Sequence, residues 1–232
     1  MCTRTVCVLA HVFEAHGIAT VALASNRAVA ETMHPPRALY CEFPLGRPLG
    51  RPGDTTFQTT VLEAAFALLE SPTVPVLADF PVVIEAETAP LACALPPRFD
   101  PTLPPAVDEA RALRAAWERS RDRRGRTSVG RVVPGERVDE IAGAFAAIAS
   151  GTPWKEAGLP GNPIGCAHDL RDYYEEAALE LADGPDAAAP GAVELWYYDV
   201  TEAGRTVLAA RTVMQDTGAP FPLWFYLARG TR

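Results

Sequence analysis

The sequence predicts an α/β protein with a mostly parallel sheet flanked by helices, in a Rossmann-like or flavodoxin-like arrangement. Two observations predict it: short, continuously apolar segments typical of strands buried on both faces, and helical periodicity in the segments between them. The chain has 232 residues, 48% of them hydrophobic, which is enough to bury a substantial core.

The first elements follow one another at short intervals. Residues 3–16 carry apolar side chains at i, i+3, i+4 and i+7, which predicts a helix that a glycine then ends. Residues 18–24 are short and apolar and read as a buried strand. A short helix is expected over residues 27–33, because the Pro-Pro pair that follows disfavours helical backbone before it, and a second strand over residues 38–43.

The pattern changes after the second strand. A loop rich in Pro and Gly covers residues 44–54 and leads into a helix with Thr and Gln at capping-box spacing. Residues 74–77 and 80–84 have strand composition, but their prolines favour edge or terminal positions. Six prolines in residues 88–105 indicate a linker or extended loop. We therefore expect an α/β half over residues 1–87, a Pro-rich connection over 88–105, and a second α/β half over 106–232, which could belong to the same domain.

The second half alternates between helical and strand-like segments. The first helix of this half is dense in Arg. We interpret these arginines as a solvent-exposed face that pairs with acidic neighbours, in preference to a phosphate-binding patch. A loop over residues 152–166 is also rich in Pro and Gly. The expected helices cover residues 106–123, 136–150, 169–182 and 201–215, and the expected strands 193–198 and 222–227.

Charge and cysteine usage exclude several classes of protein. A net charge of −8 argues against a nucleic-acid partner or an anionic membrane, both of which need a surplus of Lys and Arg. The sequence has neither a signal-peptide pattern nor a run of about 18 apolar residues, so a cytoplasmic location and no membrane partner are expected. Five cysteines without a CxxC motif predict reduced thiols and no metal site.

Cys2 is the leading candidate for a reactive thiol. It stands immediately before the first predicted helix, where unpaired backbone N–H groups and the helix dipole favour a thiolate. Arg4 adds a nearby cation, and both effects lower the pKa of a cysteine below its ordinary value of about 8.5. The alternative is that a cysteine beside the initiator methionine belongs to a disordered terminus.

Three further stretches accompany Cys2-Thr-Arg-Thr5. They are Glu14-Ala-His-Gly-Ile-Ala-Thr-Val21, Pro35-Pro-Arg-Ala-Leu-Tyr40 and Phe43-Pro-Leu-Gly-Arg-Pro-Leu-Gly50. Together they resemble the selenoprotein B family of glycine, sarcosine and betaine reductases, and the related D-proline reductase, over about residues 2–70. The resemblance implies that Cys2 stands where the family has a selenocysteine or cysteine that attacks or reduces a small substrate. We expect no bound cofactor, and an external thiol or dithiol could serve as the reductant.

The chain departs from this family in three respects. It has no selenocysteine, the first family strand is missing ahead of Cys2, and nothing family-like occurs in the second half.

Other residues are candidates for binding or for a second site. His34 ends a predicted helix and could reach a cleft, and Arg47 and Arg51 belong to a loop after a strand, where parallel α/β folds bind ligands. Cys166 and His168 rank second as a nucleophile and its base, and their i, i+2 spacing lets them meet only in an irregular loop.

The functional hypotheses follow from these residues. The first is a thiol-dependent reductase or reductive-cleavage enzyme acting on a small amine- or carboxylate-bearing molecule, with Cys2 as nucleophile and Arg4 as its electrostatic support. The second is a non-catalytic small-ligand-binding or complex subunit that retains the fold. A third is a different enzyme that uses Cys166 and His168. A homodimer or a partner in a reductase complex is compatible with the sequence.

Overall fold

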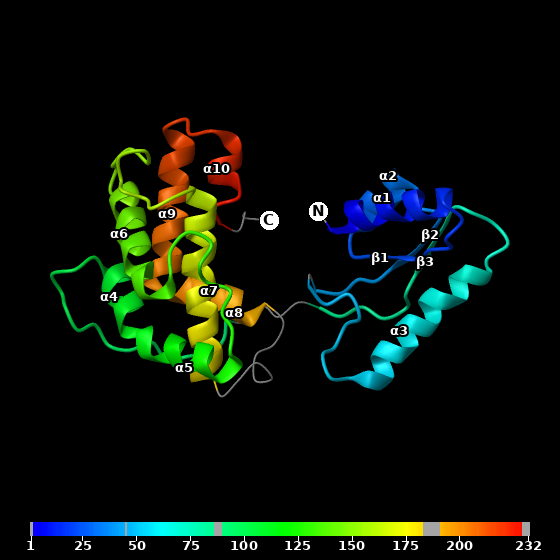
Figure 1. Cartoon of the computed structure of the whole chain (residues 1–232), viewed down its shortest axis with the longest axis horizontal. Coiled ribbons are helices and arrows are strands. Elements are labelled where there is room, and N and C mark those ends of the chain that lie inside the picture. The colour runs from blue at the N-terminus through cyan, green and yellow to red at the C-terminus, as the bar shows by residue number, and fades with distance from the viewer. Residues whose placement is uncertain (1, 45, 86–89, 183–190, 229–232) are drawn as a thin grey trace. The chain divides into compact units, whose positions relative to one another are not determined.

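The chain divides into two compact units, residues 1–86 and 87–232 (Figure 1). The computed structural model describes residues 2–44, 46–85, 90–182 and 191–228. The first unit contains a parallel sheet flanked by helices, so the prediction of an α/β protein is confirmed there. In the described part of the second unit, every regular element is a helix.

The sheet of the first unit has three short parallel strands. They are β1 (Ala22–Ala24), β2 (Arg37–Tyr40) and β3 (Val76–Asp79), in the order β1-β2-β3. Ala22 lies opposite Ala38 in the register of β1 and β2. Because side chains alternate between the two faces of a strand, each face of the sheet presents its own set of apolar residues.

Helices cover both faces of this sheet, as Figure 1 shows. Helices α1 (Cys2–Ala15) and α2 (Arg27–Met33) lie on one face, and α3 (Thr55–Ala67) with its 3-10 turn η1 (Leu68–Glu70) lies on the other. The two cores are separate: Cys7, Ala24 and Ala30 on the first face, and Leu39, Cys41, Phe43, Val61, Ala65 and Phe80 on the second.

Two local predictions for this unit are corrected. The N-cap of α3 is Asp54, whose side chain accepts the Phe57 N–H at 3.0 Å, so the Thr–Gln capping box does not form. Residues 80–84 are not a regular strand. Pro81 cannot donate to a ladder, yet the Phe80 N–H donates to the carbonyl of Tyr40, the last residue of β2, at 2.8 Å, and the Ile84 N–H donates to that of Glu42 at 3.0 Å.

The second unit is built around one long central helix. Seven helices and a 3-10 turn are described in it: α4 (Pro105–Ala112), α5 (Arg114–Arg124), η2 (Gly135–Arg137), α6 (Val138–Ala149), α7 (Pro163–Leu181), α8 (Ala192–Val200), α9 (Glu202–Asp216) and α10 (Phe221–Phe225). The prediction of strands over residues 193–198 and 222–227 is wrong, since α8 and α10 occupy them. Burial of aromatic side chains in a helical core outweighs their strand propensity here.

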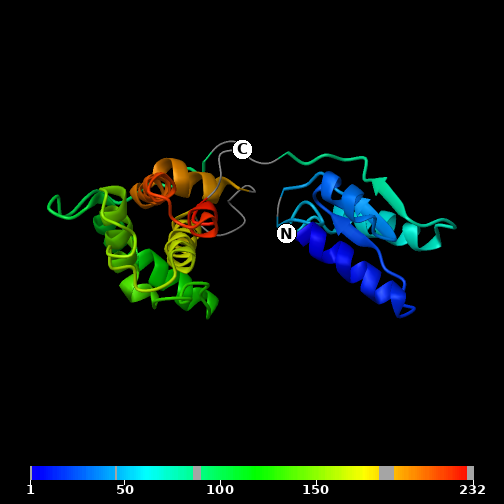
Figure 2. The ribbon, with the colours of Figure 1, turned by 90° about the horizontal axis from the view of Figure 1, so that it is seen from above.

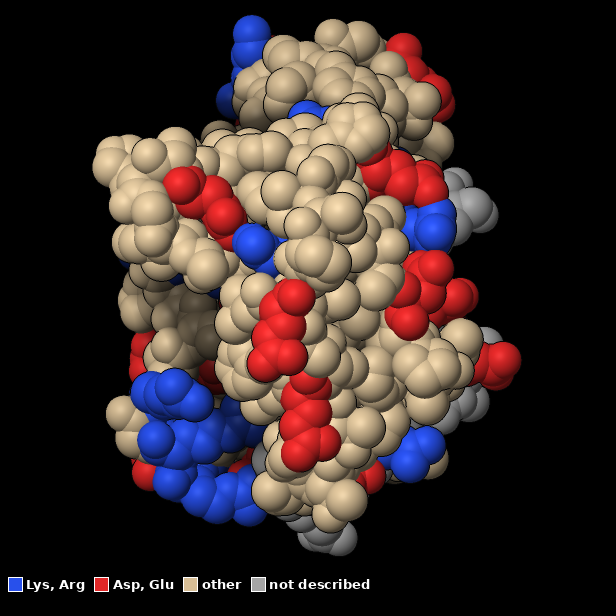
Figure 3. Space-filling model, turned by 90° about the vertical axis from the view of Figure 1, so that its right-hand side faces the viewer, with Lys and Arg blue, Asp and Glu red and all other residues tan. Residues whose placement is uncertain are grey.

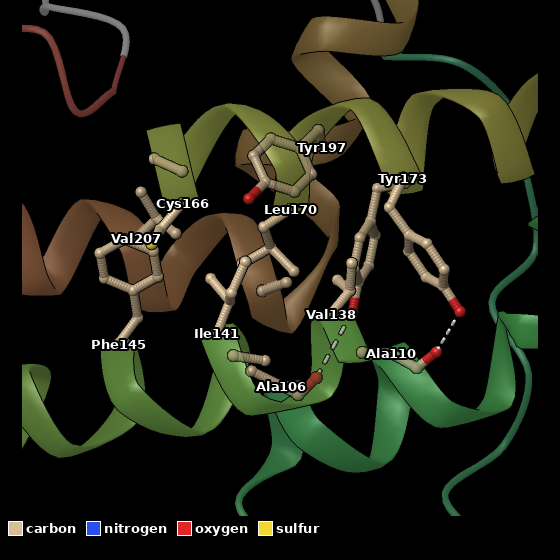
Figure 4. Close-up of a cluster of buried hydrophobic side chains, with 14 of the residues drawn as sticks. Ala106, Ala110, Val138, Ile141, Phe145, Cys166, Leu170, Tyr173, Tyr197 and Val207 are labelled. Carbon is tan, nitrogen blue, oxygen red and sulfur yellow. Dashed lines mark hydrogen bonds between the residues drawn. The ribbon is translucent and has the colours of Figure 1, made fainter. Parts of the chain in front are cut away.

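Helix α7 carries the centre of this core (Figure 4). Its Tyr173 stacks on Trp117 of α5 with ring centroids 5.4 Å apart, and the Tyr173 hydroxyl donates to the carbonyl of Ala110 at 2.8 Å. Its Leu170 is fully buried among side chains of α6, α8 and α9. The hydroxyl of Tyr173 therefore links α7 to α4 by a hydrogen bond.

The Pro-rich segment ahead of α4 is packed against the helical unit. The Leu91 N–H donates to the carbonyl of Ala192 at 2.9 Å, and the Trp196 indole N–H donates to the carbonyl of Cys93 at 3.0 Å. Farther along, the Asp108 carboxylate accepts the N–H groups of residues 99 and 100. In its described part, this segment is a strap on the second unit and not a free linker.

Candidate functional site

The carboxyl edge of the three-stranded sheet is the candidate site of the first unit. Loops that follow the carboxyl ends of parallel strands form the usual binding surface of α/β folds. Here β1 is followed by Ser25 and Asn26, β2 by Cys41 and Glu42, and Asp79 ends β3.

The N-terminus of α1 lies at this edge. The Thr3 hydroxyl lies 3.3 Å from the Ser25 hydroxyl and accepts the Ser25 N–H, also at 3.3 Å. Thr3 is buried, with 6% of its surface exposed. Cys2 is the first residue of α1 rather than a residue ahead of it, and its backbone lies one position from this contact. The Cys2 side chain lies outside the described part of the chain.

A two-point ion pair crosses the same edge. The Arg27 guanidinium at the start of α2 donates to both carboxylate oxygens of Asp79, at 3.0 and 3.2 Å, and also pairs with Glu31. The hydrogen bond from Arg27 lowers the pKa of Asp79. Both side chains are about half exposed, so the pair contributes little stability. Sequence reasoning missed it, although both residues adjoin strand ends, which was a usable signal.

Arg47 and Arg51 belong to the loop after β2, on the carboxyl side of the sheet. The Arg51 guanidinium lies 5.7 Å from the centre of the Phe57 ring. Gly50 shapes this loop: its φ is +81°, and a Cβ there would lie 2.5 Å from the Phe57 ring and 2.8 Å from Ile84. The loop therefore depends on glycine at this position.

His34 lies at the opposite edge of the sheet. It is the C-cap of α2 in a left-handed conformation, with φ 46° and ψ 52°, and β2 begins three residues later. It lines a hollow of about 180 Å³ together with Pro35, Pro75 and Val76. The structure therefore does not bring His34 together with the start of α1.

The four cysteines other than Cys2 share one electrostatic property. Cys7, Cys41 and Cys166 are buried and Cys93 is half-buried. Burial raises the pKa of all four thiols, to about 11 for Cys41 and Cys166. Cys41 follows β2 at the carboxyl edge, but only 3% of its surface is exposed.

Cys166 and His168 do not form a nucleophile–base pair. The expected irregular loop is wrong here, because Asn162 caps α7 by accepting the N–H groups of Ile164 and Gly165. Residues two apart on a helix point to different sides. Cys166 points into the core beside Val207 (Figure 4). His168 is half-buried, and burial lowers its pKa.

Sequence reasoning also missed a buried carboxylate, Asp169 of α7. Asp169 is fully buried and accepts four consecutive backbone N–H groups, those of Gly130, Arg131, Val132 and Val133, at 3.1, 3.0, 2.7 and 3.2 Å. Burial raises the pKa of this carboxyl, but the backbone hydrogen bonds outweigh burial and the net shift is downward. The carboxylate holds the loop after α5 on α7.

Arginines of α5 form ion pairs with acidic neighbours, as the sequence suggested. Arg119 and Arg123 contact Glu180 at 3.6 and 2.6 Å, and Arg121 contacts Glu136 at 2.9 Å. Basic side chains do gather on the surface, and one dense patch of Lys and Arg is visible in Figure 3.

The chain is thus a mixed α/β protein in which a unit with a small parallel sheet flanked by helices is joined to a unit whose described elements are helical. No helix within the described ranges is long and apolar enough to span a membrane. No family model, curated protein or solved structure matches the chain.

Proposed function

We propose that this protein is a thiol-dependent reductase or reductive-cleavage enzyme, similar to the selenoprotein B family, with Cys2 as its nucleophile. The first unit would then be a small version of a Rossmann-like or flavodoxin-like domain, and it would bind its substrate at the carboxyl edge of the sheet. One observation supports the proposal most directly: the Thr3–Ser25 contact holds the start of α1 at that edge.

The other cysteines support the same assignment by exclusion. Burial raises the pKa of Cys7, Cys41, Cys93 and Cys166, so none of these thiols is prepared to ionise near neutral pH. Cys2 is the first residue of a 14-residue helix, a position at which the helix dipole and backbone N–H groups without intrahelical acceptors generally favour a thiolate.

The proposed chemistry assigns a role to each sequence-predicted residue on this edge. The Cys2 thiolate attacks the substrate carbon that bears the amine, so that a C–S bond forms as the C–N bond breaks, and the external dithiol then cleaves the C–S bond. Arg4 supports the negative charge of the thiolate, and Arg47 or Arg51 pairs with the substrate carboxylate. In the overall reaction the C–N bond of the substrate is replaced by a C–H and an N–H bond. An external dithiol supplies the two electrons and two protons and is oxidised to its disulfide.

The experiment measures alkylation by iodoacetamide from pH 5 to 9, with the modified residue located by peptide mass spectrometry. We expect Cys2 to react with an apparent pKa well below 8.5, and Cys2→Ser to abolish the fast phase. The matched control is Cys93→Ser, which removes a half-buried cysteine and should leave the fast phase unchanged. Amine release from glycine or sarcosine, and ring opening of D-proline to an open-chain primary amine, are then compared between the two variants with dithiothreitol as the reductant. Ordinary titration of Cys2, together with full activity of Cys2→Ser, would refute the proposal.

A second candidate is a non-catalytic small-ligand-binding or complex subunit. The exposed apolar side chains on and after α1 favour it, since contiguous apolar surface is typical of contacts with partners. In that case Cys2→Ser should change neither ligand affinity nor oligomeric state. Loss of ligand binding in this variant would favour the enzyme.

A further inference from the structure

Trp and Tyr rings of the helical unit contact one another in a continuous chain. Trp117 of α5 stacks on Tyr173 of α7 with ring centroids 5.4 Å apart, and Tyr173 lies 6.0 Å from Tyr174. From Tyr174 the ring contacts continue into α8, to Trp196, Tyr197 and Tyr198. In Figure 2, α7 (yellow) lies between the green helices, which include α5, and the orange helices, which include α8. Because Trp and Tyr each lose one electron to form a radical, rings in contact provide a path for an electron.

The first ring of this chain borders an open groove. Trp117 is 1% exposed, yet its ring lines a hollow of about 350 Å³ together with Arg121, Val133 and Gly135. The Arg121 guanidinium lies over the same ring, 4.9 Å from its centre. The two tyrosines of α7 are buried and do not line the groove. A small oxidant in the groove therefore meets Trp117 before it meets any tyrosine of α7.

Two rings of the chain have a carboxylate as a hydrogen-bond acceptor. The Trp117 indole N–H donates to Glu176 at 3.0 Å, and both side chains are buried. The Tyr174 hydroxyl hydrogen-bonds to Glu109, which is 8% exposed and also accepts the N–H groups of residues 202 and 203. A Trp or Tyr ring that loses an electron becomes a strong acid. The carboxylate beside each ring is placed to take up the proton that is then released.

The neighbouring tyrosines lack such an acceptor. The Tyr173 hydroxyl donates to the carbonyl of Ala110 at 2.8 Å (Figure 4), and a backbone carbonyl does not take up a proton. The Tyr197 hydroxyl is fully buried and has no hydrogen-bond partner among the described residues. A radical on either ring would keep its proton and a positive charge inside the core, which is costly. Tyr174 is therefore the tyrosine of this chain on which an oxidising equivalent comes to rest.

We propose that the helical unit contains an electron-transfer path in which Tyr174 reduces a radical formed on Trp117, with the Tyr173 ring as the bridge. A one-electron oxidant in the groove, such as an oxygen-centred radical, takes an electron from Trp117, and the indole proton passes to Glu176. An electron from Tyr174 then restores Trp117, which recovers its proton from Glu176. The phenol proton of Tyr174 passes to Glu109.

An external thiol closes the cycle. It gives one electron to the Tyr174 radical through the same rings, and the phenol recovers its proton from Glu109. The thiol releases its own proton to solvent, and two thiyl radicals combine to a disulfide. The net result is that the oxidant gains one electron and the thiol loses one, so the path removes oxidising equivalents from the groove.

The path does not depend on the proposed reductase activity. All of its rings and both of its carboxylates belong to the helical unit, whereas Cys2 belongs to the first unit. Cys2→Ser should therefore leave the path unchanged, and loss of the path should leave the alkylation rate of Cys2 unchanged.

The test is pulse radiolysis of the full chain. Azide radicals oxidise tryptophan by one electron, and transient absorption follows the tryptophan and tyrosine radicals separately. The parent protein carries Trp154→Phe and Trp224→Phe, which remove the two partly exposed tryptophans and leave Trp117 and the fully buried Trp196. We expect the tryptophan radical to decay as a tyrosine radical appears, at a rate independent of protein concentration. Trp117→Phe should remove this phase.

Two adjacent tyrosines provide a matched pair of variants. Tyr174→Phe should abolish the tyrosine radical, whereas Tyr173→Phe keeps the bridging ring and should preserve its yield. Glu109→Gln keeps an acceptor for the phenol but is a far weaker base, so it should slow the electron transfer at least roughly tenfold. Circular dichroism verifies that each variant is folded. A ring cluster with only a packing role would not distinguish Tyr173→Phe from Tyr174→Phe in this assay.

Three results would overturn the proposal. The first is a tryptophan radical that decays in the parent protein without formation of a tyrosine radical. The second is a yield of tyrosine radical that survives Tyr174→Phe, or that Tyr173→Phe abolishes as fully as Tyr174→Phe does. The third is a rate that Glu109→Gln leaves unchanged, since the phenol proton would then go elsewhere.

Discussion

Replacing Asp169 by alanine removes the acceptor of four backbone N–H groups. Two of these donors belong to Gly130 and Arg131, which are exposed and can turn to water, whereas Val133 is 3% exposed and Val132 is partly buried. A buried donor left without an acceptor costs about 1–3 kcal/mol. With the loss of the charged acceptor itself, we expect Asp169→Ala to lower the free energy of unfolding of the helical unit by ~3–5 kcal/mol.

The assay is equilibrium unfolding in urea followed by tryptophan fluorescence. All four tryptophans lie in the second unit, at positions 117, 154, 196 and 224, so the signal reports that unit alone. The matched control is Asp172→Ala, one turn along α7, whose carboxylate pairs with the half-exposed Arg131. It should cost less, ~1–2 kcal/mol, because the Asp172 side chain is only 13% exposed but its arginine partner is half-exposed. Equal losses for the two variants, or a loss below ~1 kcal/mol for Asp169→Ala, would refute the reasoning.

Three further predictions concern pH, packing and thiol access. Burial raises the pKa of Glu175 to about 7, above its ordinary value, so the folded state holds its proton more tightly than the unfolded state. This group therefore adds to the free energy of unfolding below about pH 4, and the contribution is lost as pH rises through 7. The loss should be about 2 kcal/mol after allowance for the partial exposure of the side chain. In urea titrations, Glu175→Gln should remove this pH dependence. A Cβ on Gly135 would lie 2.2 Å from the Trp117 ring, so Gly135→Ala should cost ~2–3 kcal/mol. Gly143→Ala, inside α6 with its nearest atom at 3.6 Å, should instead add ~0.5–1 kcal/mol, and thermal unfolding distinguishes the two. Finally, Ellman's reagent should react with the buried Cys7, Cys41 and Cys166 only after unfolding, and reaction of any of them in the native protein would contradict the burial described here.

The first seventy residues were well predicted because each element has its own local signal. Gly17 ends the first helix, and Asn26 caps the next one. Of the apolar residues 18–24 that were predicted to form a strand, the last three do so, as β1. The sequence also contained a signal that was not used: residues 193, 196, 197 and 200 of α8 are apolar at helical spacing, although their aromatic side chains suggested a strand.

The candidate site was only partly predictable. The order of a helix followed by a strand places the start of α1 at the carboxyl edge, and a residue just before a strand, such as His34, belongs to the amino edge. The contacts that fix these positions join residues far apart in the chain. The Thr3–Ser25 contact spans 22 positions and the Arg27–Asp79 pair spans 52, and no local pattern reports either of them.

The strap ahead of α4 determines where the helical unit can be separated from the rest of the chain. A fragment that starts at Pro105 would lack the carbonyl that accepts the Trp196 indole N–H, and would leave Asp108 without the two N–H groups it accepts. Partly buried Leu91, Leu95 and Leu103 would be lost from the edge of its core. An independently folding second unit should therefore begin near residue 90, about fifteen residues before its first helix.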